Sequence, residues 1–198
     1  MKRYYHKYFE GYEEEKVPAK NGKGTRIAHT YVSYYFRQGV NEWVRIALRI
    51  LYLAMSLAAF GCLLYAATSY AHCNQTPWMV VAQALTLLAF LWFAWVLAYY
   101  VCAPKEMTIY KYKSTALQML KVCKWLTAAF LLDAAGVAAD LLLFGGASEK
   151  EELLCLGSYL LGGLLILGLG LIERALPYER LSNDKEITWY RERMEWRY

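Results

Sequence analysis

Four long apolar stretches constrain the fold of this chain more than any other feature of its sequence. Each is close to the ~20 residues that an α-helix needs to cross a hydrocarbon core ~30 Å thick. None has the alternation of apolar and polar residues that is typical of membrane-spanning strands. A backbone exposed to lipid must satisfy its own hydrogen bonds, which a helix does within one segment. The sequence therefore predicts an all-α integral membrane protein, a four-transmembrane-helix bundle with spans at residues 46–68, 79–101, 125–144 and 153–172.

The distribution of positive charge predicts the orientation of this bundle. Of the 22 Lys and Arg residues, ten lie within residues 1–49, five within 102–124 and six from residue 173 onward, whereas residues 69–77 contain none. Lys and Arg close to the membrane are retained in cytoplasmic loops. Both termini and the central loop are therefore expected to be cytoplasmic, in a plasma membrane. This bias explains the net charge of +5, so the expected partner is the lipid bilayer and not a nucleic acid.

The same pattern divides the chain into a cytoplasmic N-terminal segment, a transmembrane domain and a cytoplasmic tail. In the first, the turn signal Asn21-Gly22 precedes a β-branched and aromatic run over residues 25–36, which predicts a β-hairpin. The alternating residues 107–113 of the central loop predict a further strand, and the two are expected to pair in a small cytoplasmic β element. The charged, aromatic tail is expected to form a C-terminal cytoplasmic helix. The three regions are residues 1–45, 46–176 (with the cytoplasmic loop 102–124) and 177–198.

Two aspartates inside the third apolar stretch are the first candidates for a functional site. An ionisable group is costly inside a bilayer, so it usually has a partner or a role. Asp133 and Asp140 are seven residues apart. This spacing places them within about 20° of each other around a helix and about 10 Å apart along it. We expect both to face the same neighbour, at two successive depths in the membrane.

Polar and small side chains on the other spans extend this candidate intramembrane site. Four polar side chains are expected near the aspartates by their depth: Gln83, Thr86 and Ser158 level with Asp140, and Ser56 level with Asp133. Small residues on the third and fourth spans are expected to let these two helices pack closely. The glycines among them are Gly136, Gly162, Gly163 and Gly168.

Three interpretations of Asp133 remain open. In the first, it takes up and releases a proton, or holds a cation, during transport. In the second, it is hydrogen-bonded and fixes the register of its helix, adding about 1 kcal/mol. In the third, its face binds a helix of another protein. For Asp140, which lies nearer to water, the structural interpretation is favoured.

No motif indicates an enzyme, a metal site or a cofactor. His6, His29 and His72 are scattered along the sequence, and no Ser or Cys near them is arranged as a nucleophile. The five cysteines show no CxxC or Cys/His pattern, which argues against a metal site. Cys73 and Cys155 are both expected on the outer face, either as a disulfide or, as favoured, as two unpaired thiols.

Two functions from different classes follow. The first is a non-catalytic accessory or assembly subunit that docks a larger membrane complex through its cytoplasmic aromatic platform and small-residue helix face. The second is a small proton- or cation-coupled transporter or channel that uses Asp133 and Asp140. Apart from these two, Gln83 is the only strongly polar side chain well inside the spans, and a solute path usually needs more. This favours the subunit, bound to a protein partner or in a homo-oligomer, and makes an enzyme the least favoured class.

Overall fold

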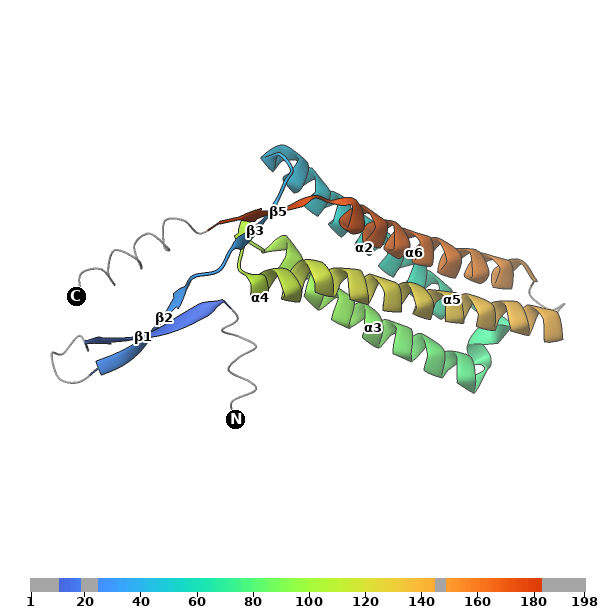
Figure 1. Cartoon of the computed structure of the whole chain (residues 1–198). Coiled ribbons are helices and arrows are strands. Elements are labelled where there is room, and N and C mark those ends of the chain that lie inside the picture. Colours follow the sequence, from blue (N-terminus) through green and yellow to red (C-terminus); the bar gives the residue numbers. More distant parts are fainter. Residues whose placement is uncertain (1–10, 19–24, 145–148, 183–198) are drawn as a thin grey trace. The chain divides into compact units, whose positions relative to one another are not determined.

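The computed structural model describes residues 11–18, 25–144 and 149–182, which fall into two compact units (Figure 1). Unit 1 combines the chain up to Gly39 with Ala103–Ser114 and the segment from Pro177 onward. Unit 2 combines Val40–Cys102 with Thr115–Leu176 and contains the long helices.

Four helices of the described chain are long and apolar enough to cross a membrane, as the sequence predicted. Such helices imply a lipid bilayer around unit 2. α3 has Pro77 in its first turn, where the missing N–H of proline costs no hydrogen bond. The helices are α2 (Glu42–Thr68), α3 (Pro77–Val101), α5 (Gln118–Phe144) and α6 (Glu149–Ala175), and the short 3-10 helix η1 (His72–Gln75) lies between α2 and α3.

The third helix begins earlier than the sequence predicted. α4 (Ile109–Tyr112) and a π-helical turn, η2 (Lys113–Leu117), lead without a break into α5. The strand predicted over residues 107–113 is therefore wrong for all but its first residue. The reason is a local cap, because the Thr108 hydroxyl accepts a hydrogen bond from the Lys111 N–H and starts a helix. In a run this short, alternation does not distinguish a strand from a helix.

Close approach of α5 and α6 depends on glycine. A methyl group on Gly162 would lie 2.6 Å from Cε1 of Phe130, and one on Gly163 would lie 3.2 Å from Cβ of the same residue. The Phe130 side chain is fully buried, so its ring occupies the space that these glycines leave. The other two predicted packing glycines face other helices: Gly136 lies against Trp78 of α3, and Gly168 against Met55 of α2.

Unit 1 contains two small antiparallel sheets, so the chain combines the predicted four-helix bundle with a small β element, as expected. β1 (Tyr12–Pro18) pairs with β2 (Thr25–Tyr31). In the second sheet, β3 (Tyr35–Gln38) lies between β4 (Glu106–Met107) and β5 (Tyr178–Leu181). Its three strands come from the segments that precede α2, separate α3 from α5 and follow α6 in the sequence.

β5 corrects part of the prediction for the tail. The sequence predicted a helix over residues 177–198, but Tyr178–Leu181 is extended and pairs with β3 along its whole length. These backbone hydrogen bonds replace the ones that a helix would supply. The rest of the predicted helix, residues 183–198, and the predicted Asn21-Gly22 turn lie outside the described residues.

Aromatic side chains join the strands of the second sheet. The rings of Phe36 and Tyr112 stack with centroids 4.1 Å apart, and the Tyr178 ring meets Tyr112 edge-on at 5.0 Å. The guanidinium of Arg180 lies 5.2 Å from the centroid of the Tyr34 ring, which is a cation–π contact. We call these five residues the aromatic platform.

Candidate functional site

Asp133 lies in the interior of unit 2. It is completely buried on α5, and Thr86 of α3 and Tyr159 of α6 are its polar neighbours. Neither carboxylate oxygen of Asp133 makes a hydrogen bond to a described residue, and the hydroxyl of Tyr159 makes none either. A buried polar group without a partner lowers stability. Packing alone therefore does not explain why an aspartate stands at position 133.

Asp140 makes a contact that the sequence did not reveal. The residue is 2% exposed near the end of α5, and its Oδ2 lies 3.0 Å from Nδ1 of His72 in η1. Its other oxygen, Oδ1, is buried and has no hydrogen-bond partner among the described residues. The two residues are 68 positions apart, so no spacing rule connects them. The one signal in the sequence was the hydrophilic turn between the first two spans, which contains His72 and is expected near the depth of Asp140.

Replacing Asp133 with leucine is expected to raise the free energy of unfolding of unit 2 by about 1–3 kcal/mol, because an unsatisfied buried group is removed. Asp140→Leu is the matched comparison, and we expect it to destabilise because it removes the contact with His72. Thermal and denaturant unfolding in detergent measures both. A loss of stability in Asp133→Leu would show that the carboxyl group has a partner after all, and would favour the structural interpretation.

Gln83 belongs to a cap at the end of α2. Its Nε2 donates a hydrogen bond to Oδ1 of Asn74, at 2.6 Å. The Nδ2 of Asn74 in turn donates to the carbonyl oxygens of Ala66 and Ser69, at 2.8 and 2.9 Å. Carbonyl groups in the last turn of a helix lack partners within the helix. Gln83 thus holds Asn74 against the end of α2, which is a structural role.

Cys73 and Cys155 are free thiols beside this cap. Both are fully buried, and Sγ of Cys155 lies 2.7 Å from the hydroxyl oxygen of Ser69. A hydrogen bond to Cys155, together with burial, raises the pKa of the Cys73 thiol. The neutral thiol is the weaker nucleophile and the weaker metal ligand. Cys73 therefore lacks the character of an activated thiolate.

Two of the predicted polar residues are satisfied within their own helices. The hydroxyl of Ser56 donates to the carbonyl oxygen of Leu53, and that of Ser158 donates to the carbonyl oxygen of Leu154, each at 2.8 Å. Such bonds to the preceding turn are common for helical serine. The structure thus brings Thr86 beside Asp133, whereas neither serine forms a hydrogen bond with an aspartate.

A third buried carboxylate, Glu173, lies at the other end of unit 2. It is 2% exposed in the last turn of α6. Its Oε2 accepts hydrogen bonds from the hydroxyls of Tyr52 on α2 and Tyr100 on α3, at 3.0 and 2.6 Å. The two tyrosine rings stack with centroids 5.5 Å apart. The sequence did not identify Glu173 as a buried residue, because the predicted fourth span ended one residue before it.

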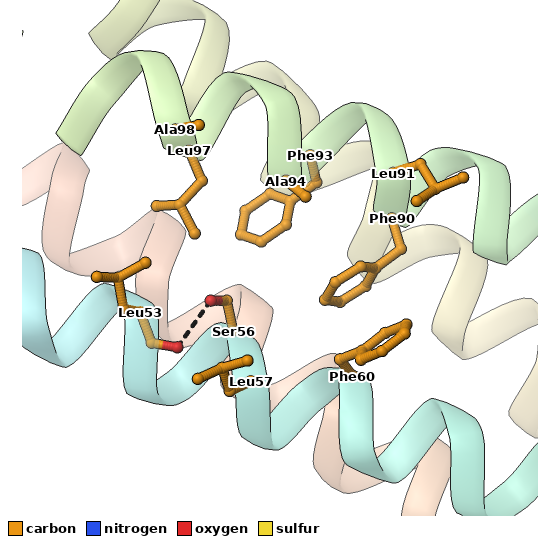
Figure 2. Close-up of a pocket in the computed structure, with 10 residues that line it drawn as sticks. All are labelled: Leu53, Ser56, Leu57, Phe60, Phe90, Leu91, Phe93, Ala94, Leu97 and Ala98. Carbon is orange, nitrogen blue, oxygen red and sulfur yellow. Dashed lines mark hydrogen bonds between the residues drawn. The ribbon is translucent and has the colours of Figure 1, made fainter. Parts of the chain in front are cut away.

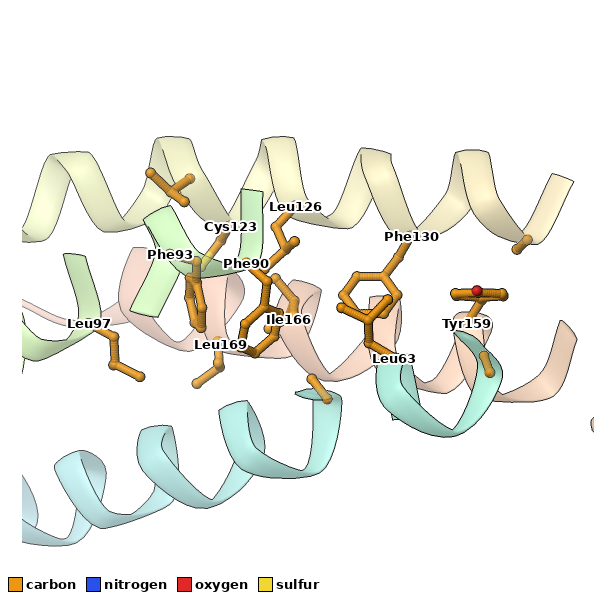
Figure 3. Packing of buried hydrophobic residues seen from close by; sticks show 14 of the residues in the cluster. Leu63, Phe90, Phe93, Leu97, Cys123, Leu126, Phe130, Tyr159, Ile166 and Leu169 are labelled. Carbon is orange, nitrogen blue, oxygen red and sulfur yellow. The ribbon is translucent and has the colours of Figure 1, made fainter. Parts of the chain in front are cut away.

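Buried apolar side chains of the four long helices form a layer in the interior of unit 2 (Figure 3). Thr127 is the exception among the buried side chains of α5 in this layer, and its hydroxyl has no hydrogen-bond partner among the described residues. The described side chains therefore form no continuous polar path between the two ends of unit 2. The buried apolar side chains of the layer include Phe90, Phe93, Leu126, Phe130, Ile166 and Leu169.

A pocket of about 400 Å³ opens between α2 and α3 (Figure 2). Leu53, Leu57 and Leu91 at its walls are exposed, so the pocket is reached from the surface of the bundle. Ser56 is the one polar residue among those that line it, and its hydroxyl is bonded to the carbonyl of Leu53. The lining residues are Leu53, Ser56, Leu57, Phe60, Phe90, Leu91, Phe93, Ala94, Leu97 and Ala98.

The buried carboxyl groups and the pocket are thus the two features of unit 2 from which a function can be argued. In comparisons with known proteins, the chain matches no family model, no curated protein and no solved structure.

Proposed function

We propose that this chain is a non-catalytic accessory or assembly subunit of a larger membrane-protein complex. The pocket between α2 and α3 is the observation that carries the proposal. It is an apolar recess of about 400 Å³ on the surface of the transmembrane unit. The described side chains provide no polar route through that unit, and a solute path needs one. A surface suited to docking, without such a route, favours binding of another membrane protein.

A transmembrane helix of the partner fits the walls of this pocket. Ala94 and Ala98 line its α3 side, at the four-residue spacing that lets helices approach closely. On α2, Gly61 is exposed, and a Cβ on it would meet no atom within 4 Å. Lipid tails are as apolar as leucine, so close backbone packing is what favours a helix over lipid at such a surface.

The predicted packing glycines of α5 and α6 support this choice of surface, because side chains of this chain already fill the space beside them. Gly162 and Gly163 lie against Phe130, and Gly136 lies against Trp78. A partner helix would have to displace these side chains. The small-residue face that is open to a partner is therefore on α2 and α3.

The aromatic platform of unit 1 supplies a second contact for the partner. Tyr34 and Arg180 are exposed there and already interact with each other. Tyrosine, phenylalanine and arginine are enriched in protein interfaces and among the residues that contribute most to binding. A partner with both a transmembrane helix and a segment outside the bilayer would use both surfaces.

A photo-crosslinking amino acid at position 94 tests this function. In the native membranes, it is expected to form an adduct with one membrane-spanning protein at a fixed ratio. Ala98→Leu fills the pocket wall and is expected to reduce that adduct at least about tenfold, the equivalent of ~1.4 kcal/mol of binding. The matched control is the same amino acid at Leu164, an exposed position on α6.

Three outcomes would contradict the subunit proposal. The first is an adduct with lipid alone. The second is an adduct with twice the mass of this chain, which would indicate a homo-oligomer. The third is a protein adduct that forms equally well from position 164, or that Ala98→Leu leaves unchanged.

A proton- or cation-coupled transporter is the second candidate, and Asp133 is the observation that favours it. A carboxyl group that is buried in a membrane span without a hydrogen-bond partner is typical of ion and proton pathways. The test is proton and cation flux in liposomes that contain the purified protein. Flux above that of empty liposomes, lost in Asp133→Asn, supports this candidate. Equal flux with both proteins, or none, contradicts it.

A further inference from the structure

Three side chains of metal-binding types meet at the η1 end of unit 2. They are His72 of η1, Asp140 of α5 and Glu152 of α6, and their ligand atoms all lie within 4.8 Å of one another. Asp140 and Glu152 are 2% and 5% exposed, whereas the side chain of His72 is 48% exposed. The group therefore consists of two buried carboxylates and one imidazole that solvent can reach.

The charges of this group are not balanced by the described residues. Two carboxylates at this distance repel each other, and burial strengthens the repulsion. Among the described residues, Glu152 makes no ion pair, and Asp140 has only its contact with His72. The Oδ1 of Asp140 is also buried without a hydrogen-bond partner there. A deficit of positive charge and an unused ligand atom in the same place are what a missing cation would leave.

We infer that His72, Asp140 and Glu152 bind a divalent transition-metal ion, for which Zn²⁺ is the best fit. Zn²⁺ takes imidazole nitrogen and carboxylate oxygen at ~2.0–2.2 Å in a tetrahedron, so that neighbouring ligand atoms stand about 3.3 Å apart. The distance of 3.0 Å between Nδ1 of His72 and Oδ2 of Asp140 is close to that edge. The ligand atom of Glu152 lies within 4.8 Å of both of these atoms, and it would have to move to about 3.3 Å from them to complete the set. Mg²⁺ and Ca²⁺ prefer all-oxygen sites, so the imidazole selects against them.

The ion links three segments that are distant in the sequence. η1 connects α2 to α3, Asp140 lies near the end of α5, and Glu152 lies in the first turn of α6. The fourth ligand position is open to water on the exposed side of His72, as in many zinc sites with three protein ligands. Because metal binding to a folded site adds to folding stability, the ion holds this end of unit 2 together. The separations between these residues match no sequence motif, and for that reason the sequence predicted no metal site.

Zinc titration of the purified, tag-free protein tests this inference. After treatment with a chelator and dialysis, isothermal titration calorimetry is expected to show one Zn²⁺ per chain, and elemental analysis after gel filtration is expected to give the same ratio. His72→Ala and Glu152→Gln should each weaken binding at least about tenfold. Excess Zn²⁺ should raise the unfolding temperature of the wild type, but not that of His72→Ala.

Two controls make the test specific. His29→Ala removes an exposed histidine of β2 and should leave zinc binding unchanged. The double replacement of Cys73 and Cys155 by serine should also leave it unchanged, because the thiols are not among the proposed ligands. The inference fails if zinc does not bind, if His72→Ala binds as tightly as the wild type, or if either control loses binding. Since His72 is half exposed, His72→Ala is expected to fold, and each variant is assayed as the monodisperse fraction.

Discussion

Replacing Glu173 with alanine is expected to lower the free energy of unfolding of unit 2 by about 3–5 kcal/mol. The substitution removes two hydrogen bonds at once, from the hydroxyls of Tyr52 and Tyr100. It leaves both hydroxyls in a buried environment where water does not replace the lost acceptor. Because these tyrosines belong to α2 and α3, the loss affects the contact of three helices. Unfolding in detergent, followed by heat or by denaturant, measures the effect.

Single changes in the same group separate its contributions. Tyr52→Phe and Tyr100→Phe keep the ring stacking and each remove one hydroxyl, so each is expected to cost about 1–2 kcal/mol. Glu151→Ala is the matched control, because Glu151 is an exposed glutamate on the same helix; it should stay within about 0.5 kcal/mol of the wild type. If Glu173→Ala were as stable as Glu151→Ala, the buried hydrogen bonds would not stabilise unit 2.

Gly162→Ala is expected to destabilise the contact of α5 and α6 by about 1–3 kcal/mol, the usual cost of overfilling a packed interior. The added methyl group would lie 2.6 Å from the ring of Phe130, and that ring is fully buried. Either the ring moves into its neighbours or the two helices separate. The same unfolding measurements in detergent report this cost.

Gly157→Ala is the matched control, since it is the same change on the same helix. A methyl group there would meet no atom within 4 Å, and alanine is the better helix former by about 1 kcal/mol. Gly157→Ala should therefore be neutral or stabilising. Combining Gly162→Ala with Phe130→Leu should recover part of the loss, because the smaller side chain makes room for the methyl group. Equal stability of the two glycine variants would contradict the proposed tight contact.

The four spans were predictable because each is a local property of its own stretch of sequence. A run of about 20 apolar residues can be recognised as a membrane span without knowing which other segments pack against it. The burial of Asp133 follows from the same reasoning, since the residue lies in the middle of such a run. The corrected elements show the limit of this approach. Residues 107–113 and Tyr178–Leu181 are short, so the Thr108 cap and the pairing with β3 decided their structure.

The partners of the buried carboxylates could not be predicted from the sequence, for a different reason. Asp140 and His72 are 68 positions apart, and Glu173 lies 121 and 73 positions from its two tyrosines. Periodicity shows which face of a helix is buried, but not which residue of another helix stands opposite. The pocket between α2 and α3 depends in the same way on how far two helices separate. These features can be identified only when the packing of all the helices of unit 2 is known.

The pairing of β3 with β4 and β5 sets a condition on membrane insertion. α2 and α3 separate β3 from β4 in the sequence, and α5 and α6 separate β4 from β5. Strands share a sheet only if they are on the same side of the bilayer, so each of these helix pairs has to cross the membrane and return. If one helix failed to insert, the strands after it would emerge in the opposite compartment and the sheet would not form. Because β5 follows α6 in the sequence, the three-stranded sheet is complete only after all four helices have been inserted in the correct orientation.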